Sequence, residues 1–392
     1  MPLLQRLRLR EVPWTPLVLA LLLTATGVAF VISACYDPGH RFGLGREAQL
    51  QMAWWLVSIV ACAAVAHVPL TTWRALAIPA YIGGLVVQVA MLALQGTALV
   101  PAIKGQHNWL ALGSLRVQPS EFIKLAVLLG CARLVSSAGF DARRFTHVLG
   151  ALALAGLPAA LIAKEDLGSA LTFPAMIGGI LVLMGMRTSH LVLLLLSLTL
   201  VAGVGIARLP KDGPDAYKYQ RLQAFWHPEQ YASTEAYQTI RSIRSIGSGQ
   251  LTGKGYTAGD QNRLGWLPEK HTDMIFAVVG EEVGFVGSAM ILVGFMLFAW
   301  SGLLAAAQAR DVFGRALAAG YVCLVMGQAA INLAVALGLM PVTGITLPFF
   351  SYGGSSLLGT YLGLGLLLAT GASGRPQLST ATRTTRTTSR GW

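Results

Sequence analysis

The chain has 392 residues, 54% of them hydrophobic, and its mean hydropathy is +0.61. Charged residues make up 12%, against about 25% in an ordinary soluble domain, which argues against a soluble protein and favours the bilayer as its solvent. The net charge of +12 comes from basic residues between apolar runs and in the two tails. No basic face is interleaved with aromatic residues, so we expect no nucleic-acid partner.

The apolar runs predict the membrane spans, because a spanning helix needs about 20 mostly apolar residues. The candidate segments, in chain order, are Trp14–Ala34, Ala48–Val68, Trp73–Leu94, Pro119–Ser137, Thr146–Ala163, Leu167–Met186, Leu191–Leu209, Met274–Ala306, Ala316–Leu339 and Phe350–Gly371. The charged run Lys164-Glu165-Asp166 separates the fifth segment from the sixth, because a single helix would bury three charges in hydrocarbon. The sequence therefore predicts an all-α integral membrane protein with about ten transmembrane helices.

Basic residues are distributed unevenly between the two sides of the membrane. With both termini in the cytoplasm, the inner side holds Arg6, Arg8, Arg10, Arg74, Arg133, Arg143, Arg144, Arg187, Arg310, Arg315, Arg375, Arg383, Arg386 and Arg390, and the short outer loops hold only Arg41, Arg46, Lys104, Arg116 and Lys164. Since cytoplasmic loops carry the basic excess, we expect this orientation. Residues 1–13 are then a cytoplasmic segment, residues 14–371 the transmembrane domain, and residues 372–392 a disordered cytoplasmic tail that can contact anionic membrane lipids.

This orientation places one long polar loop, residues 210–273, on the outer face between the seventh and eighth helices. Long structured loops are usually functional. Aromatic residues give this loop material to pack against the membrane or a substrate: Tyr217, Tyr219, Phe225, Trp226, Tyr231, Tyr237, Tyr256 and Trp266. Trp109 lies in a second outer stretch, residues 95–118, and is either an interfacial anchor or a stacking platform for a sugar ring.

Two polar features could carry chemistry. Glu121 and Lys124 lie three residues apart in the fourth helix, so they share a face, either as a buried pair that fixes helix packing or as part of a substrate site. Asp273, where the long loop meets the eighth helix, is either an N-cap of that helix or a general base flanked by Lys270 and His271. Composition and spacing alone leave an enzyme and a transporter open.

The same residues carry a family resemblance. The chain reads Gln118-Pro119-Ser120-Glu121 after Trp109, Leu267-Pro268-Glu269-Lys270-His271-Thr272-Asp273 before the eighth helix, and Pro341-Val342-Thr343-Gly344 with Ser351-Tyr352-Gly353-Gly354-Ser355-Ser356 before the last. These motifs, in this order, resemble the SEDS family (shape, elongation, division and sporulation). The Val-Thr-Gly and the stretch Gly253-Lys254-Gly255-Tyr256 to Pro268 are more similar to its RodA branch than to its division branch, FtsW.

Three motifs depart from the family pattern. The family's Gln-Pro-Asp-Leu-Gly is Lys164-Glu165-Asp166-Leu167-Gly168 here, Arg241 replaces a glutamine in Tyr-Gln-x-x-Gln-Ser, and Gln250 replaces the last glycine of Gly-Ser-Gly-Gly. Because these positions lie around the loop's expected substrate face, donor handling or partner contacts can differ.

The resemblance implies a peptidoglycan glycosyltransferase that polymerises lipid II at the outer face of the bacterial cytoplasmic membrane, with a class B penicillin-binding protein as partner. The RodA branch implies a role in cell elongation and shape. Inversion at the donor's anomeric carbon requires a base on the attacking side, and the resemblance assigns that role to Asp273. The candidate substrate-binding residues are Trp109, Glu121, Lys124, Arg221, Lys254, Lys270 and His271.

The departing diphosphate requires cationic stabilisation. A divalent cation, Mg²⁺ or Mn²⁺, is a candidate, although no ligand cluster in the sequence identifies its site and we assign no metal ligand. Three rival interpretations remain: a lipid II flippase, which would depend on charges deep in the bundle, a non-catalytic scaffold, and an FtsW-like division glycosyltransferase.

Overall fold

The computed structural model describes residues 13–36, 45–103, 106–113, 115–207 and 216–372. A helix occupies each predicted span: α1 (Trp14–Ala34), α2 (Arg46–His67), α3 (Leu70–Ala93), α4 (Pro119–Val135), α5 (Phe145–Ile162), α6 (Leu167–Leu183), α7 (Thr188–Ala207), α11 (Ile275–Gln308), α12 (Val312–Ala336) and α13 (Gly354–Ala372). The break between α5 and α6 is confirmed, because the side chain of Asp166 accepts a hydrogen bond from Ser169 N and caps α6.

The molecule is an all-α integral membrane protein. Within the described residues, seven helices are long and apolar enough to cross a bilayer, while α6 is apolar but shorter. Large apolar side chains lie exposed on the outside of the bundle, among them Leu56 on α2 and Met290 and Trp300 on α11, as lipid-facing helices require. The number of ten crossings and their orientation stay predictions.

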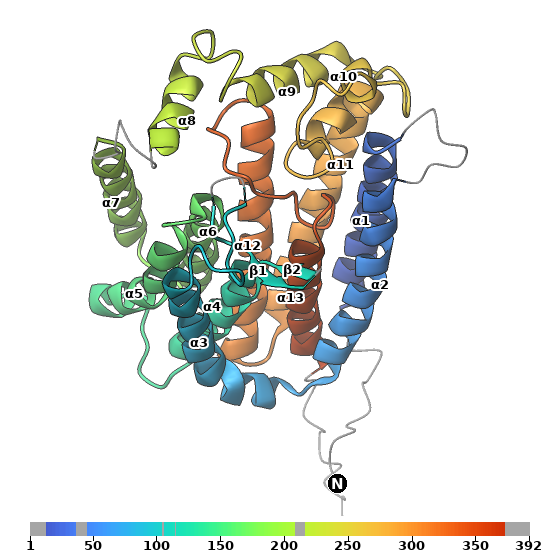
Figure 1. The fold of residues 1–392 in the computed structure, drawn as a ribbon. Coiled ribbons are helices and arrows are strands. Elements are labelled where there is room, and N and C mark those ends of the chain that lie inside the picture. Colours follow the sequence, from blue (N-terminus) through green and yellow to red (C-terminus); the bar gives the residue numbers. More distant parts are fainter. Residues whose placement is uncertain (1–12, 37–44, 104–105, 114, 208–215, 373–392) are drawn as a thin grey trace, which may run out of the picture.

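The helix α12 lies in the middle of the bundle and packs against α4, α6, α11 and α13 (Figure 1). The main departure from an all-helical chain is a short antiparallel hairpin of β1 (Leu110–Leu112) and β2 (Leu115–Val117), which the apolar periodicity did not predict.

The described part of the long loop forms three helices, α8 (Ala216–Trp226), α9 (Tyr237–Ser248) and α10 (Asp260–Arg263). They lie together at one end of the bundle, which we call the loop end (Figure 1). Two hydroxyls fix α9 there: Ser242 Oγ donates to Ala336 O of α12 at 2.6 Å, and Ser245 Oγ donates to Ala277 O of α11 at 3.1 Å. The loop is therefore a folded cover over α11 and α12.

A break in α11 completes this attachment. Gly284 has φ 62° and ψ −161°, a conformation that only glycine adopts easily, so the regular helix is interrupted there. Segment 250–255 pairs with the interrupted backbone: Phe285 N donates to Gln250 O at 2.8 Å, and Lys254 N donates to Glu281 O at 3.0 Å. The hydrogen bonds lost in the helix are thus replaced by bonds to the loop.

We expect Gly284→Ala to destabilise the protein by about 2 kcal/mol or more. A Cβ there would lie 2.4 Å from Gly253 N and 2.7 Å from Leu251 C, and the backbone conformation itself is strained for alanine. The matched control is Gly83→Ala in α3, where a Cβ meets nothing within 4 Å and alanine favours the helix. Thermal unfolding in detergent compares the two, and equal midpoints would contradict this account of the break.

Candidate functional site

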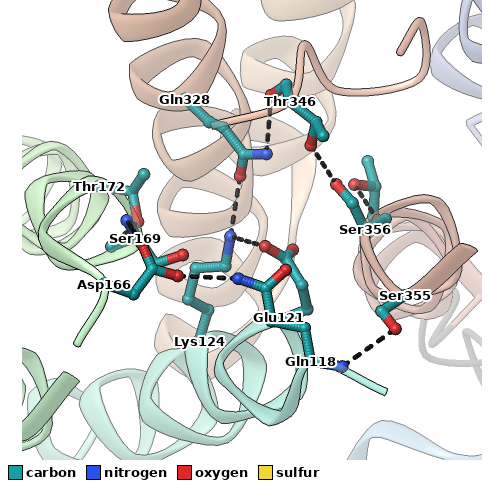
Figure 2. Close-up of polar contacts among 11 residues, drawn as sticks. Gln118, Glu121, Lys124, Asp166, Ser169, Thr172, Gln328, Thr346, Ser355 and Ser356 are labelled. Carbon is teal, nitrogen blue, oxygen red and sulfur yellow. Dashed lines mark hydrogen bonds and ion pairs between the residues drawn. The ribbon is translucent and has the colours of Figure 1, made fainter. Parts of the chain in front are cut away.

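Lys124 lies at the centre of a buried polar chain inside the bundle (Figure 2). Its Nζ donates to Glu121 Oε1 at 2.8 Å and to Gln328 Oε1 at 2.9 Å. Glu121 is 6% exposed and Lys124 2%. The predicted contact is confirmed, and Gln328 of α12 supplies the second acceptor that a buried ammonium needs.

The buried polar chain around Lys124 continues into the segment that precedes α13. Gln328 Nε2 donates to Thr346 O at 3.1 Å, and the hydroxyls of Thr346 and Ser356 lie 2.7 Å apart (Figure 2). The buried ion pair is therefore connected to the segment 338–353, which is irregular and is buried over Leu347–Ser351.

Gln118 extends the polar chain toward α6. Its Nε2 donates to Asp166 Oδ2 at 2.8 Å, and its backbone N donates to Ser355 Oγ at 3.1 Å (Figure 2). Since the other carboxylate oxygen of Asp166 caps α6, this acid joins α6 to Gln118 at the start of α4, and Gln118 in turn bonds to α13. The acid retained in the altered Lys164-Glu165-Asp166 motif thus has a structural role.

Asp273 lies half-buried on the turn just before α11. Asn332 Nδ2 of α12 donates to Asp273 O at 2.8 Å and to Ile345 O at 2.7 Å. A Cβ added to Gly344 would lie 3.9 Å from Asp273 Oδ2, so the carboxylate faces the Val342-Thr343-Gly344 motif. The capping interpretation placed the N-cap of α11 one residue too early, because the N-cap residue is Met274, whose side chain makes no capping hydrogen bond.

The neighbours of Asp273 contact the turn before α13. His271 O accepts a hydrogen bond from Tyr352 N at 2.8 Å, and the two rings lie 5.5 Å apart. Gln51 of α2 holds the other side of this turn, donating to Ser351 O at 2.9 Å and accepting from Gly353 N at 3.2 Å. Burial lowers the pKa of Lys270 below its ordinary value, which indicates a lysine drawn partly out of water beside this turn.

Lys254 lies in a separate cluster at the loop end. Its Nζ lies 2.8 Å from Glu281 Oε1 and 2.9 Å from Asp260 Oδ2. Burial acts to lower the pKa of Lys254, but the hydrogen bonds and charges of these two carboxylates outweigh it and the pKa is raised. Its charge therefore serves an internal ion pair.

Trp109 and Arg221 lie on other elements. Trp109 is half-buried directly before β1, and Arg221 lies on α8. Their substrate roles stay predictions, as do those of Glu121, Lys124, Lys254, Lys270 and His271.

Comparison with known proteins identifies the family. A family described as "Cell cycle protein", which comprises FtsW, RodA and SpoVE, matches residues 13–374. The chain belongs to the SEDS family.

Relatives of both branches are similar to the chain over most of its length. The probable peptidoglycan glycosyltransferase FtsW of Geobacter sp. (strain M18) is 34% identical and covers 90% of this chain and 94% of its own. The peptidoglycan glycosyltransferase MrdB of Escherichia coli (strain K12) is 33% identical and covers 84% and 86%. The prediction of an enzyme of this class agrees with these names, whereas the choice of the RodA branch stays a prediction.

Solved structures show the same fold. Thermus thermophilus rod shape determining protein RodA is 28% identical, with a TM-score of 0.65, over 91% of this chain and 96% of that one. A chain from a structure described as "Structural coordination of polymerization and crosslinking by a peptidoglycan synthase complex" is 29% identical, with a TM-score of 0.74, over 91% and 97%.

The SEDS motifs led to Asp273 and Glu121, but the amides that bond to Asp273 O, to Lys124 and to the turn before α13 were missed. Gln328 and Asn332 lie four residues apart in α12 and so share a face, and Gln51 lies in α2. A polar side chain inside an apolar run was the available signal. In the described residues no group of three or more His, Cys, Asp and Glu side chains could hold a metal ion, and the divalent cation stays a prediction.

The structure shows the conformation or contacts of the three residues that depart from the SEDS pattern. Gln250 has φ 49°, in the left-handed region that favours the family's glycine. Glu165 accepts a hydrogen bond from His107 N at 3.0 Å and so ties the stretch before Trp109 to the start of α6. Arg241 lies between two aromatic rings, at 5.1 Å from the centroid of each.

We expect Glu281→Gln to destabilise the protein by about 3 kcal/mol, the range for removing one partner of a buried pair. Glu281 is fully buried and accepts from Lys254 Nζ, from Ser245 Oγ at 3.0 Å and from Gln261 N at 3.1 Å. Since the pKa of Lys254 is raised, the part of the stability that comes from its protonation is complete below its ordinary pKa of 10.5 and is lost as the pH rises above it.

The free energy of unfolding, measured at neutral pH in detergent, is compared between Glu281→Gln and the control Glu229→Gln. Glu229 is an exposed carboxylate of the same loop. Lys254→Met combined with Glu281→Gln completes a double-mutant cycle. Single effects that simply add would show that the pair is not coupled.

Proposed function

We propose that this chain is a peptidoglycan glycosyltransferase that polymerises lipid II at the outer face of the cytoplasmic membrane, with Asp273 as its general base. The observation that carries the proposal is the position of Asp273. Its carboxylate faces a glycine motif at the end of the molecule covered by the long loop, while Asn332 fixes its backbone. The names of its FtsW and MrdB relatives support the reaction class.

The reaction needs a base at this position. The 4-hydroxyl of the acceptor sugar attacks the anomeric carbon of the donor, the bond to the prenyl diphosphate breaks, and the configuration inverts. Asp273 takes the proton of the attacking hydroxyl, and the diphosphate leaves with the bonding electron pair. A positioned base contributes about 10²–10⁴-fold to such a step.

The three candidate lysines have different surroundings and so different proposed roles. Lys124 is enclosed by Glu121 and Gln328, and Lys254 is paired with two carboxylates. We assign the charge of the leaving diphosphate to Lys270, because it lies three residues before Asp273 in the sequence.

The proposed partner is a class B penicillin-binding protein. The similar chain from a peptidoglycan synthase complex that coordinates polymerisation and crosslinking supports this assignment. The proposed branch is RodA, with a role in elongation, on the grounds of Val342-Thr343-Gly344 and the Gly253–Pro268 stretch. A fluorescent fusion distributed along the lateral wall supports that branch, and one confined to the division site supports the FtsW-like role.

We expect Asp273→Asn to lower polymerisation of labelled lipid II by about 10²-fold or more, because the amide keeps the shape but cannot accept the proton. The assay uses purified full-length protein in detergent with its penicillin-binding protein. Glu229→Gln is the control and retains full activity. Normal glycan from a folded Asp273→Asn variant would remove Asp273 as the base.

The same preparation separates the rival functions. A flippase reconstituted in vesicles moves labelled lipid II between leaflets and makes no glycan, whichever residue stands at 273. A scaffold does neither, but it alters the partner's crosslinking.

We expect Asn332→Leu to reduce kcat for polymerisation by about tenfold with little change in KM. The leucine has no donor for Asp273 O or Ile345 O, so the turn that carries the base loosens while the rest of the substrate surface is kept. Asn332→Gln, which retains the amide, restores part of kcat. A loss confined to KM would contradict a positioning role.

A further inference from the structure

The guanidinium of Arg241, at the loop end, contacts two aromatic rings. It lies over the rings of Tyr237 and Trp266, 5.1 Å from each centroid. Contact with two rings restricts the side chain, while the N–H groups of the guanidinium keep their capacity for hydrogen bonds.

The N–H groups of Arg241 make few hydrogen bonds within the described part of the protein. Nη1 donates to Gln261 Oε1 at 3.5 Å, a long bond, and a guanidinium carries five N–H donors. In the part of the chain that the structure describes, no carboxylate lies within ion-pair distance of Arg241. The group is a fixed fork whose charge is not neutralised by any acidic side chain, which is the form of arginine that binds oxyanions.

Arg241 belongs to the same end of the molecule as Asp273. Its neighbour Ser242 is anchored to Ala336 O in α12, one turn beyond Asn332, which holds Asp273. Its stacking partner Trp266 begins the stretch that runs through the buried Leu267 to Asp273. Figure 1 shows α9, which carries Arg241, lying over the loop-end tips of the central helices.

We propose that Arg241 binds a phosphate oxyanion of a lipid-linked molecule. The preferred source is the prenyl diphosphate of the donor, in which case the inference rests on the proposed function. The other source is the headgroup of an anionic phospholipid. Arginine replaces the family's glutamine here, so the extra cation belongs to this chain.

The test measures binding without turnover. Purified full-length protein in neutral detergent is titrated with radiolabelled farnesyl diphosphate, and dihexanoyl phosphatidylglycerol, radiolabelled for a parallel titration, serves as the competitor. We expect Arg241→Gln to weaken farnesyl diphosphate binding about 10-fold or more, the loss for charge-assisted hydrogen bonds. Arg241→Lys, a point charge without the fork, restores only part of the affinity.

The control is Arg244→Gln, which removes an exposed arginine one turn along α9 and leaves the affinity unchanged within about twofold. Unfolding midpoints equal to wild type establish that the Arg241 variants are folded. Trp266→Leu removes one stacking ring and weakens binding in the same direction.

Four outcomes are distinguished. Farnesyl diphosphate binding that depends on Arg241 and resists the competitor supports the donor diphosphate. Phosphatidylglycerol binding that depends on Arg241 supports the phosphate site and assigns it to headgroups. A wild type that binds neither probe, or Arg241→Gln that binds both as well as wild type, overturns the proposal. If the site binds but the enzyme makes no glycan, the phosphate site stands and the proposed function fails.

Discussion

The structure depends on one constraint, the need to pair the backbone of an irregular segment enclosed by membrane helices. Residues 338–353 form no helix, and the stretch Leu347–Ser351 is buried, so its N–H and C=O groups need partners within the protein. Backbone groups supply some of these bonds, and three side-chain amides supply others: Gln51 to the turn at 351–353, Gln328 to Thr346 O, and Asn332 to Ile345 O. Losing any of them would leave buried polar groups unpaired, so their positions restrict how α2 and α12 can pack.

The same amides organise the site. Gln328 accepts from Lys124, and Asn332 donates to Asp273 O, so one face of α12 holds both the ion pair of α4 and the turn before α11. Because the two amides are four residues apart on a buried helix, the positions of these groups are coupled through rigid backbone. The proposed base, held in this way, needs little reorganisation when an acceptor binds, and positioning of this kind is a general source of rate in enzymes.

Sequence reasoning succeeded where the information is local. Long apolar runs gave the helices, and the spacing of Glu121 and Lys124 gave their pairing. It failed where distant segments meet: Gln51 contacts a turn some 300 residues away, and no periodicity encodes that contact. The cap at Asp273 was wrong for a related reason. Glu269, at φ 50°, accepts from Met274 N and tightens the turn, and α11 begins after Met274, one residue beyond the predicted start.

The partners of the charged side chains, in the bundle and at the loop end, bear on the choice between transport and catalysis. In the bundle, the ammonium of Lys124 has two acceptors and is 2% exposed, which describes a structural ion better than a site along an aqueous path. At the loop end, Asp273 is half-buried before a glycine motif, and the edge of Arg241 makes one long bond. A transporter needs polar side chains along a path through the bundle. A glycosyltransferase needs its reactive polar side chains where the sugars bind. The interior pairing of Lys124 and the half-buried position of Asp273 at the loop end therefore support the proposed glycosyltransferase over a transporter.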